Sequence, residues 1–206
     1  MGNWISLKHG IDCEADFKLS NGGLDWSIDS LVVSGSELAQ TDSEKRMIAF
    51  LSERNTATLG LGNAGFEIVE MPWKAETFEA DRAFLIRTAE HAREVMQKPE
   101  TQQMLQYSVE PERVNERMDE FIALFRRMTA DLIVPEEQSD WFQWLEPDDP
   151  TLNGFPKCRR HGVLYGCFGC KICLDQSGVY PIMTEDIKRL KHLWEENPGT
   201  KEQKDR

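Results

Sequence analysis

One short stretch near the end of the chain, residues 158–173, constrains the fold more than any other feature. It reads CRRHGVLYGCFGCKIC and holds four of the five cysteines together with a histidine. Two residues separate Cys158 from His161, and two separate Cys170 from Cys173. Three thiolates and one imidazole make a closed, tetrahedral donor set. The spacing therefore predicts one metal ion, bound by these four side chains.

Each half of this set resembles a zinc knuckle, which is a tight turn that points two ligands at one ion. Gly162 follows the first pair and suits the turn, because glycine adopts positive φ without a Cβ clash. The resemblance to the zinc-knuckle and zinc-ribbon class covers residues 156–176. It implies a structural Zn²⁺ on the four side chains, and it implies no particular activity because the class shares none.

Cys167 leaves a second ligand set open. It extends the run to C-x2-C-x2-C, which also occurs in iron–sulfur proteins, and Cys158, Cys167, Cys170 and Cys173 would then hold a cluster. We favour zinc, because the cluster would leave His161 unused and the run lacks the fourth cysteine and proline of bacterial ferredoxins. Cys167 could also replace Cys170 or Cys173 as a zinc ligand.

The sequence indicates no catalytic residue. A fourth protein ligand argues against catalytic zinc, which keeps one coordination position open for water. The H-x-E pattern of zinc deaminases and the H-E-x-x-H pattern of metalloproteases are both missing. Gly60 and Gly62 resemble a phosphate-binding loop only loosely, because a strand and not a helix is expected after them. Whether the protein is an enzyme stays open, and a protein without catalytic activity is favoured.

The composition is strongly acidic, with a formal net charge of −12 and a pI near 4.8. Such a chain is repelled by phosphate backbones, so a basic protein partner is favoured over nucleic acid. No stretch approaches the roughly 18 apolar residues of a membrane span, and the N-terminus lacks the apolar run of a secretory signal. These features predict a cytoplasmic protein with no membrane partner.

The first 35 residues are expected to form short strands. Leu24, Trp26 and Ile28 alternate with polar residues, and the Asn-Gly-Gly sequence before them is typical of a hairpin turn. The expected strands of the chain begin at Trp4, Phe17, Leu24, Leu31, Thr58 and Gly65.

Helices are expected from local signals. Thr41 and Glu44 form a capping box before a helix that should end near Asn55. Two long helices, one from Phe78 to about residue 97 and one from Pro111, each carry an apolar face, so they should pack as an antiparallel pair. A last helix is expected after Thr184.

The expected fold class is α+β, with a small antiparallel sheet, a packed helical hairpin and a C-terminal zinc-knuckle module. The first domain covers residues 1–134, with the sheet in 1–73 and the hairpin in 75–134. An acidic, aromatic linker follows in residues 135–153. Residues 154–206 form the zinc-knuckle module with its closing helix.

The linker is a second candidate site. Its aromatic and acidic candidates are Trp141, Phe142, Trp144, Asp148 and Asp149. Linker aromatics most often dock the segment on its own protein, which is the reading we favour. Alternatively, they form a partner-binding surface that grips a basic protein.

Three functions are compatible with these features. The favoured one is a non-catalytic, acidic binding protein with a structural zinc that acts through protein–protein interaction. Its general make-up resembles that of small bacterial immunity and inhibitor proteins, which attract a basic toxin surface. The alternatives are a nucleic-acid-associated zinc protein, which would use the basic residues around the metal, and a redox or metal-dependent enzyme. Those basic residues are Lys157, Arg159, Arg160 and Lys171.

Overall fold

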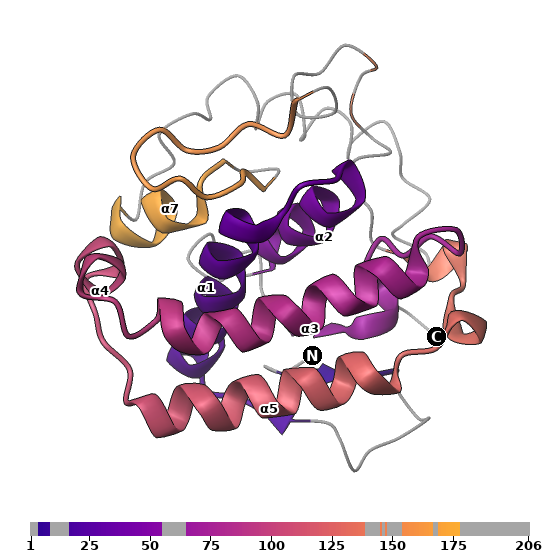
Figure 1. The fold of residues 1–206 in the computed structure, drawn as a ribbon, viewed down its shortest axis with the longest axis horizontal. Helices are drawn as coiled ribbons and strands as arrows, with labels where there is room; N and C mark the ends of the chain where they lie inside the picture. Colours follow the sequence, from indigo (N-terminus) through magenta and orange to yellow (C-terminus); the bar gives the residue numbers. More distant parts are fainter. Residues whose placement is uncertain are drawn as a thin grey trace, which may run out of the picture.

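The computed structural model is a mixed α/β fold in which helices predominate (Figure 1). It describes residues 4–8, 17–54, 65–138, 145, 147, 154–166 and 169–177. The α-helices of this part are α1 (Asn21–Leu38), α2 (Asp42–Glu53), α3 (Phe78–Val95), α4 (Pro99–Leu105), α5 (Pro111–Arg127) and α7 (Lys171–Ser177). The remaining elements are β1 (Trp4–Ser6), β2 (Phe17–Lys18), β3 (Phe66–Glu67) and the 3₁₀ helices η2 (Ile68–Glu70), η3 (Ala130–Leu132) and η4 (Pro135–Glu137).

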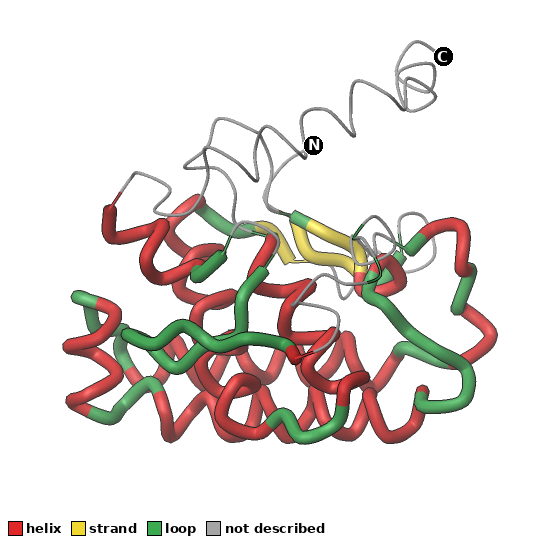
Figure 2. Tube along the Cα trace, turned by 90° about the horizontal axis from the view of Figure 1, so that it is seen from above, coloured by secondary structure: helices red, strands yellow, loops and turns green. Residues whose placement is uncertain are grey.

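The sheet is small and mixed, with β1 as its middle strand. Ile5 lies opposite Phe17 in the antiparallel pair β1–β2 and opposite Phe66 in the parallel pair β1–β3. Figure 2 shows the three strands together on one side of the helices. The expected antiparallel pairing is therefore right for β2 and wrong for β3. A parallel pair needs a long connection, and α1 and α2 lie within it.

Residues 21–38 form helix α1, so the expected hairpin and strands in this segment are wrong. The Ser20 hydroxyl caps the helix by accepting a hydrogen bond from the Gly23 N–H at 3.1 Å. Every residue from 27 to 36 is buried, because α2, α3 and α5 all pack against this helix. A helix that is buried on all sides has no polar face, so its sequence lacks the helical period.

Serines explain the strand-like alternation in α1. Ser27 and Ser30 are fully buried, and their hydroxyls donate to the carbonyls of Gly23 and Trp26, one turn earlier in the helix. A serine that bonds its own helix in this way can be buried without another partner. Of the polar positions in the expected strand, Ser27 and Asp29 are thus buried and Asp25 is half-buried.

The predicted helices after Thr41, from Phe78 and from Pro111 agree with the structure. In the capping box, the Thr41 hydroxyl accepts from the Glu44 N–H at 3.2 Å, and the Glu44 carboxylate accepts from the Thr41 N–H at 2.9 Å. Helices α3 and α5 begin where expected and run antiparallel (Figure 1). A short helix that was not expected, α4, follows α3 and begins at Pro99. No α-helix within the described ranges is long and apolar enough to cross a membrane.

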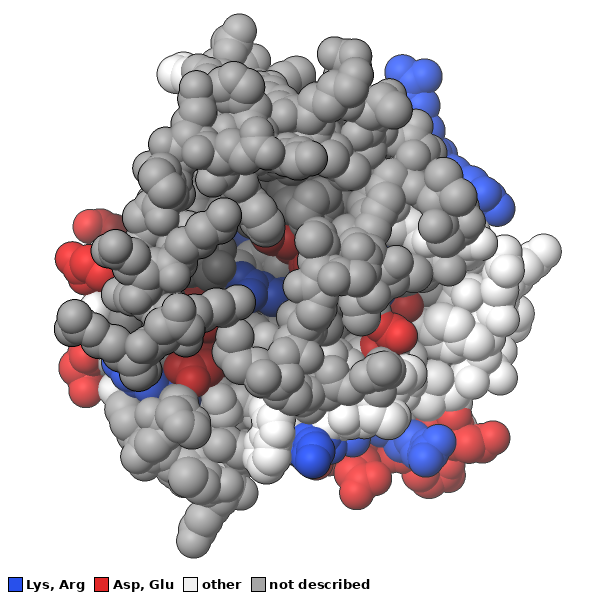
Figure 3. Space-filling view, turned by 180° about the vertical axis from the view of Figure 1, so that it is seen from behind, with Lys and Arg blue, Asp and Glu red and all other residues white. Residues whose placement is uncertain are grey.

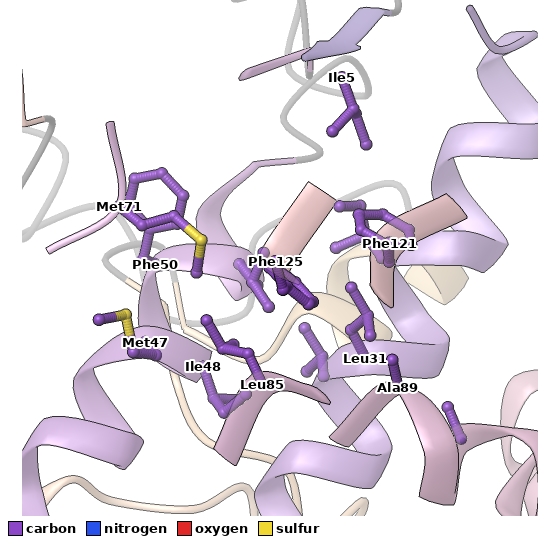
Figure 4. Close-up of a cluster of buried hydrophobic side chains, with 14 of the residues drawn as sticks. Ile5, Leu31, Met47, Ile48, Phe50, Met71, Leu85, Ala89, Phe121 and Phe125 are labelled. Atoms are coloured by element: carbon purple, nitrogen blue, oxygen red, sulfur yellow. The ribbon is translucent and has the colours of Figure 1, made fainter. Parts of the chain in front are cut away.

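The core lies where α1, α2, α3, α5 and the sheet meet. Figure 4 shows side chains from all of these elements pointing toward one another. Phe121 of α5 contacts Phe17 of β2 edge to face, with ring centroids 5.2 Å apart, and Phe50 of α2 meets Phe66 of β3 at 5.6 Å. Each large side chain buried here stabilises the fold by about 1.5–3 kcal/mol. The expected strand at residues 58–62 and the helix after Thr184 lie outside the described residues.

Gly35 marks a close approach of α1 to α2 and α3, and its substitution is our first prediction. A Cβ on Gly35 would lie 2.1 Å from Cδ1 of Ile48 and 3.2 Å from Cγ2 of Thr88. Because both neighbours are fully buried, we expect Gly35→Ala to lower the free energy of unfolding by about 1–3 kcal/mol in urea titrations. Gly22→Ala, in the same helix, is the matched control, because a Cβ there meets nothing within 4 Å. Equal effects of the two substitutions would contradict the close approach.

Candidate metal centre

The four predicted ligand side chains come together at one point. Cys158, His161, Cys170 and Cys173 each offer one donor atom, and all four atoms lie within 4.8 Å of one another. The Sγ atom of Cys158 is 3.8 Å from Sγ of Cys173 and 3.7 Å from Nδ1 of His161. The same Nδ1 lies 3.3 Å from Sγ of Cys170 and 3.3 Å from Sγ of Cys173. This cluster could hold a metal ion.

A tight turn brings the first pair of side chains together. The Gly162 N–H donates to the Cys158 carbonyl at 2.8 Å, and the Cys158 N–H donates to the Val163 carbonyl at 2.8 Å. Gly162 has φ +70°, a conformation that favours glycine. The sequence predicts a turn with positive φ at Gly162, and the structure agrees with it. The reversal of the chain places Cys158 and His161 on the same side of the turn.

A second turn and a helix place the other pair. Gly166 and Gly169 exchange two backbone hydrogen bonds, of 3.0 and 2.9 Å, and Gly169 has φ +93°. Cys170 then directly precedes α7, and Cys173 lies in the first turn of this helix. The Cys173 N–H donates to Sγ of Cys170 at 3.5 Å. This hydrogen bond holds the Cys170 sulfur toward the first turn of α7, where Cys173 lies.

Burial and neighbouring groups shift the pKa values of the four candidate ligands in different directions. Burial, and then the nearby Arg160, lower the pKa of His161. Burial alone would raise the pKa of Cys158, but hydrogen bonds from the backbone N–H groups of His161 and Arg160 and with the side chains of Cys170 and Cys173 together lower the pKa of this thiol. Burial raises the pKa of Cys170 and of Cys173. Because metals bind thiolates and neutral imidazole, a metal would displace protons from these two thiols.

Hydrogen bonds attach the segment that carries the four candidate ligands, residues 158–173, to α1 and α2. The Leu164 N–H donates to Oγ of Ser36 in α1 at 2.9 Å, and Oγ of Ser52 in α2 lies 3.3 Å from the Leu164 carbonyl. Gly166 lies against α2, where a Cβ would be 3.1 Å from the Glu53 nitrogen. Leu164 itself is buried in the same core as the helices. The proposed separation of residues 154–206 as a domain stays a prediction.

A buried ion pair forms a further attachment. Lys171 directly follows the ligand Cys170, and its Nζ lies 2.7 Å from Oδ1 of Asp29 in α1. The Lys171 side chain is 1% exposed and that of Asp29 4%. The Tyr107 hydroxyl donates to the other Asp29 oxygen at 2.7 Å. The sequence gives no sign of the interaction among Lys171, Asp29 and Tyr107, because no local pattern relates positions so far apart in the chain.

The buried lysine corrects the basic surface expected around the metal. Lys171 points into the protein, and the Lys157 ammonium donates to the Ser36 carbonyl of α1. Lys157, Arg159 and Arg160 are nevertheless exposed. Of the four positive charges expected at this surface, that of Lys171 is therefore the one withdrawn into the fold.

The remaining site candidates lie outside the described residues. They are Cys167, the alternative ligand, and the five linker residues Trp141, Phe142, Trp144, Asp148 and Asp149. Their roles stay predictions.

No protein-family model, no curated protein and no solved structure matches the chain. The cluster of three thiols and one imidazole is therefore the feature of the chain that points to a function.

Proposed function

We propose that this protein is a non-catalytic binding protein whose C-terminal part is stabilised by a structural Zn²⁺ of the zinc-knuckle type. The observation that carries the proposal is the convergence of Cys158, His161, Cys170 and Cys173 within 4.8 Å. Three sulfur donors and one nitrogen donor are a preferred ligand set of structural zinc.

The separations between the donor atoms support zinc. Zn–S bonds of about 2.3 Å and a Zn–N bond of about 2.0 Å in a tetrahedron require S···S distances of about 3.8 Å and S···N distances of about 3.5 Å. The Cys158–Cys173 sulfur distance is 3.8 Å, and the three distances from Nδ1 of His161 are 3.3, 3.3 and 3.7 Å. Four protein donors leave no position for water, which supports a structural role over a catalytic one.

The small apolar content of the segment also supports a structural ion. In residues 154–177, the described buried hydrophobic side chains other than the cysteines are those of Phe155, Val163, Leu164 and Ile172. So few side chains cannot offset the conformational entropy of ordering the whole segment. Binding of a structural zinc contributes free energy directly to folding.

The charge of the chain supports a basic protein as the partner. With a net charge of −12, the protein attracts basic surfaces and steers them toward it. Figure 3 shows positive and negative side chains next to one another along the edge formed by α5. The linker, in contrast, carries six acidic residues and no lysine or arginine in positions 135–153. The proposed function uses the alternative reading of the linker, in which Trp141, Phe142, Trp144, Asp148 and Asp149 contact the basic partner in the manner of an immunity or inhibitor protein.

Metal analysis tests the zinc proposal. We expect the purified chain to contain one zinc ion per molecule and to be colourless, because Zn²⁺ has a filled d shell. Elemental analysis and an absorption spectrum measure this. Cys167→Ser should retain the zinc, which separates the proposed ligand set from the alternative one. Broad visible absorption would instead indicate an iron–sulfur cluster.

Affinity capture from the native host tests the binding proposal. We expect a basic protein to be retained by the parent chain, released by salt, and lost from the double variant Asp148→Asn/Asp149→Asn, because screening and charge removal weaken the same attraction. The double variant Asp119→Asn/Asp131→Asn, which removes two exposed charges outside the linker, is the control of equal charge change. A salt-dependent shift of DNA or RNA with the metal-loaded chain, without a captured protein, would contradict the proposal.

A further inference from the structure

A groove opens between the first turns of α1, the connection from α4 to α5, and α7. Its volume is about 740 Å³, inside the range of about 300–1,000 Å³ that is usual for ligand sites. Nε2 of Gln176 in α7 donates to the Met104 carbonyl of α4 at 2.5 Å, and Lys171 of α7 pairs with Asp29 of α1. Figure 1 shows α4 and α7 side by side at this edge of the molecule. One wall of the groove is thus α7, the helix that carries the candidate ligand Cys173 and the ion-paired Lys171.

Hydrogen-bond acceptors gather in the groove. Asp25 and Glu110 line it, and Asp29 lies at its base with both carboxylate oxygens engaged by Lys171 and Tyr107. Oε1 of Gln176 is buried and has no hydrogen-bond partner among the described residues. Burial raises the pKa of Asp25, with Lys171 acting against it and Asp29 in the same direction. A donor that carries positive charge would satisfy these acceptors.

Two aromatic side chains also line the groove, Trp26 from α1 and Tyr107 from the α4–α5 connection. A cation is attracted to the face of such rings, and tryptophan gives the strongest attraction. Carboxylates and aromatic rings in one concave site are a combination that suits the planar guanidinium group, which donates in its plane and stacks on its face. Arg113 lies in the lining too, and its like charge opposes a cation.

We propose that this groove binds a guanidinium group, presented as an arginine side chain by the basic protein partner. That the arginine comes from a protein partner rests on the proposed function. That the groove accepts a guanidinium group rests on the residues of the groove alone. Asp25, Glu110 and Oε1 of Gln176 accept hydrogen bonds from the guanidinium, and Trp26 stacks on it. Arg113 limits the affinity.

The test is a titration of the full-length, zinc-loaded chain with the capped tripeptide acetyl-Gly-Arg-Gly-amide. The readout is the indole N–H signal of Trp26 in ¹⁵N NMR spectra, assigned with Trp26→Phe. The same peptide with citrulline in place of arginine is the matched control, because citrulline keeps the shape and loses the charge. We expect the arginine peptide to shift the signal with a millimolar Kd and the citrulline peptide to leave it in place.

Two substitutions of opposite sign identify the charge that the groove prefers. Asp25→Asn should raise the Kd about three- to tenfold, and Arg113→Gln should lower it by a similar factor. Asp131→Asn is the control of equal charge change, since Asp131 is exposed on η3, beyond the other end of α5. The reverse pair of effects would show an anion site, and equal binding of the citrulline peptide, or no shift at all, would overturn the proposal.

Further outcomes separate this proposal from the proposed function. Capture of a basic protein together with no effect of the arginine peptide on Trp26 would overturn the groove site alone. Peptide binding without any captured protein would overturn the proposed function and retain the guanidinium site. Tighter binding of free L-arginine than of the capped peptide would show that the occupant is a small molecule and not a side chain of a protein.

Discussion

Replacing Cys170 with serine should abolish metal binding and unfold the C-terminal part of the chain, while the pair α3–α5 stays folded. Cys170 is buried and contacts the other donors of the cluster. A serine hydroxyl is a poor zinc ligand, and structural zinc in small modules contributes an apparent free energy of about 10–16 kcal/mol at pH 7. Zinc content and limited proteolysis measure the two effects. We expect new cleavage sites within residues 154–177 and an intact fragment that contains α3 and α5.

A chelator should reproduce this result with the parent chain, and Cys167→Ser should not. Acidification should do the same, because protons compete with the metal for the thiolates. The metal-bound form carries fewer protons, so the stability that the metal contributes is present at neutral pH and is lost as the pH falls. Raised pKa values of Cys170 and Cys173, caused first by burial, increase this competition. An unchanged digestion pattern after loss of the metal would show that the ion does not hold the segment.

The parts of the structure that the sequence predicts are those encoded within a few neighbouring residues. The capping box of Thr41 and Glu44 is one, because both of its hydrogen bonds close within one helical turn. The Cys158–His161 turn is another, since the two-residue spacing and Gly162 determine its geometry. The apolar faces of α3 and α5 predict their packing for the same reason, as each face is a periodic pattern along a single helix.

Helix α1 shows why the rest could not be predicted. Its environment is made by α2, α3 and α5, which all lie later in the sequence. Ser34 and Ser36 are buried because the Thr88 carbonyl and the Leu164 N–H are there to bond them. Without knowledge of these partners, buried serines cannot be told from the exposed positions of a strand. The parallel pairing of β1 with β3 depends on the same long-range arrangement.

The metal centre and the buried ion pair are adjacent in the chain, and this links two sources of stability. Cys170 is a candidate ligand, and Lys171, the next residue, pairs with Asp29 of α1. A metal that holds Cys170 thus also restricts where Lys171 can reach. In turn, Tyr107 bonds the same carboxylate and lines the groove. We therefore expect loss of the metal to loosen the groove, because Lys171, Asp29 and Tyr107 connect the two sites.

The second large effect is expected from Lys171→Met. This substitution leaves the Asp29 carboxylate buried with Tyr107 as its hydrogen-bond donor and no paired cation. Removing one partner of a buried ion pair costs about 3–5 kcal/mol, because the remaining charge has lost both water and its counter-charge. Urea titrations of the zinc-loaded variant measure the loss. Tyr107→Phe should cost less, about 1.5–3 kcal/mol, since it removes one hydrogen bond to a charged group.

The double variant Asp29→Asn/Lys171→Met distinguishes an uncompensated charge from a simple loss of packing. Asparagine removes the charge and still accepts a hydrogen bond from Tyr107, so we expect the double variant to be more stable than Lys171→Met alone. Both variants should retain one zinc ion at saturating metal, because neither change touches a donor atom. Equal stability of the single and double variants would mean that the charge of Asp29 is not what destabilises Lys171→Met. Loss of zinc from the single variant alone would mean instead that the ion pair holds the ligands in place, and that the metal centre and α1 form one cooperative unit.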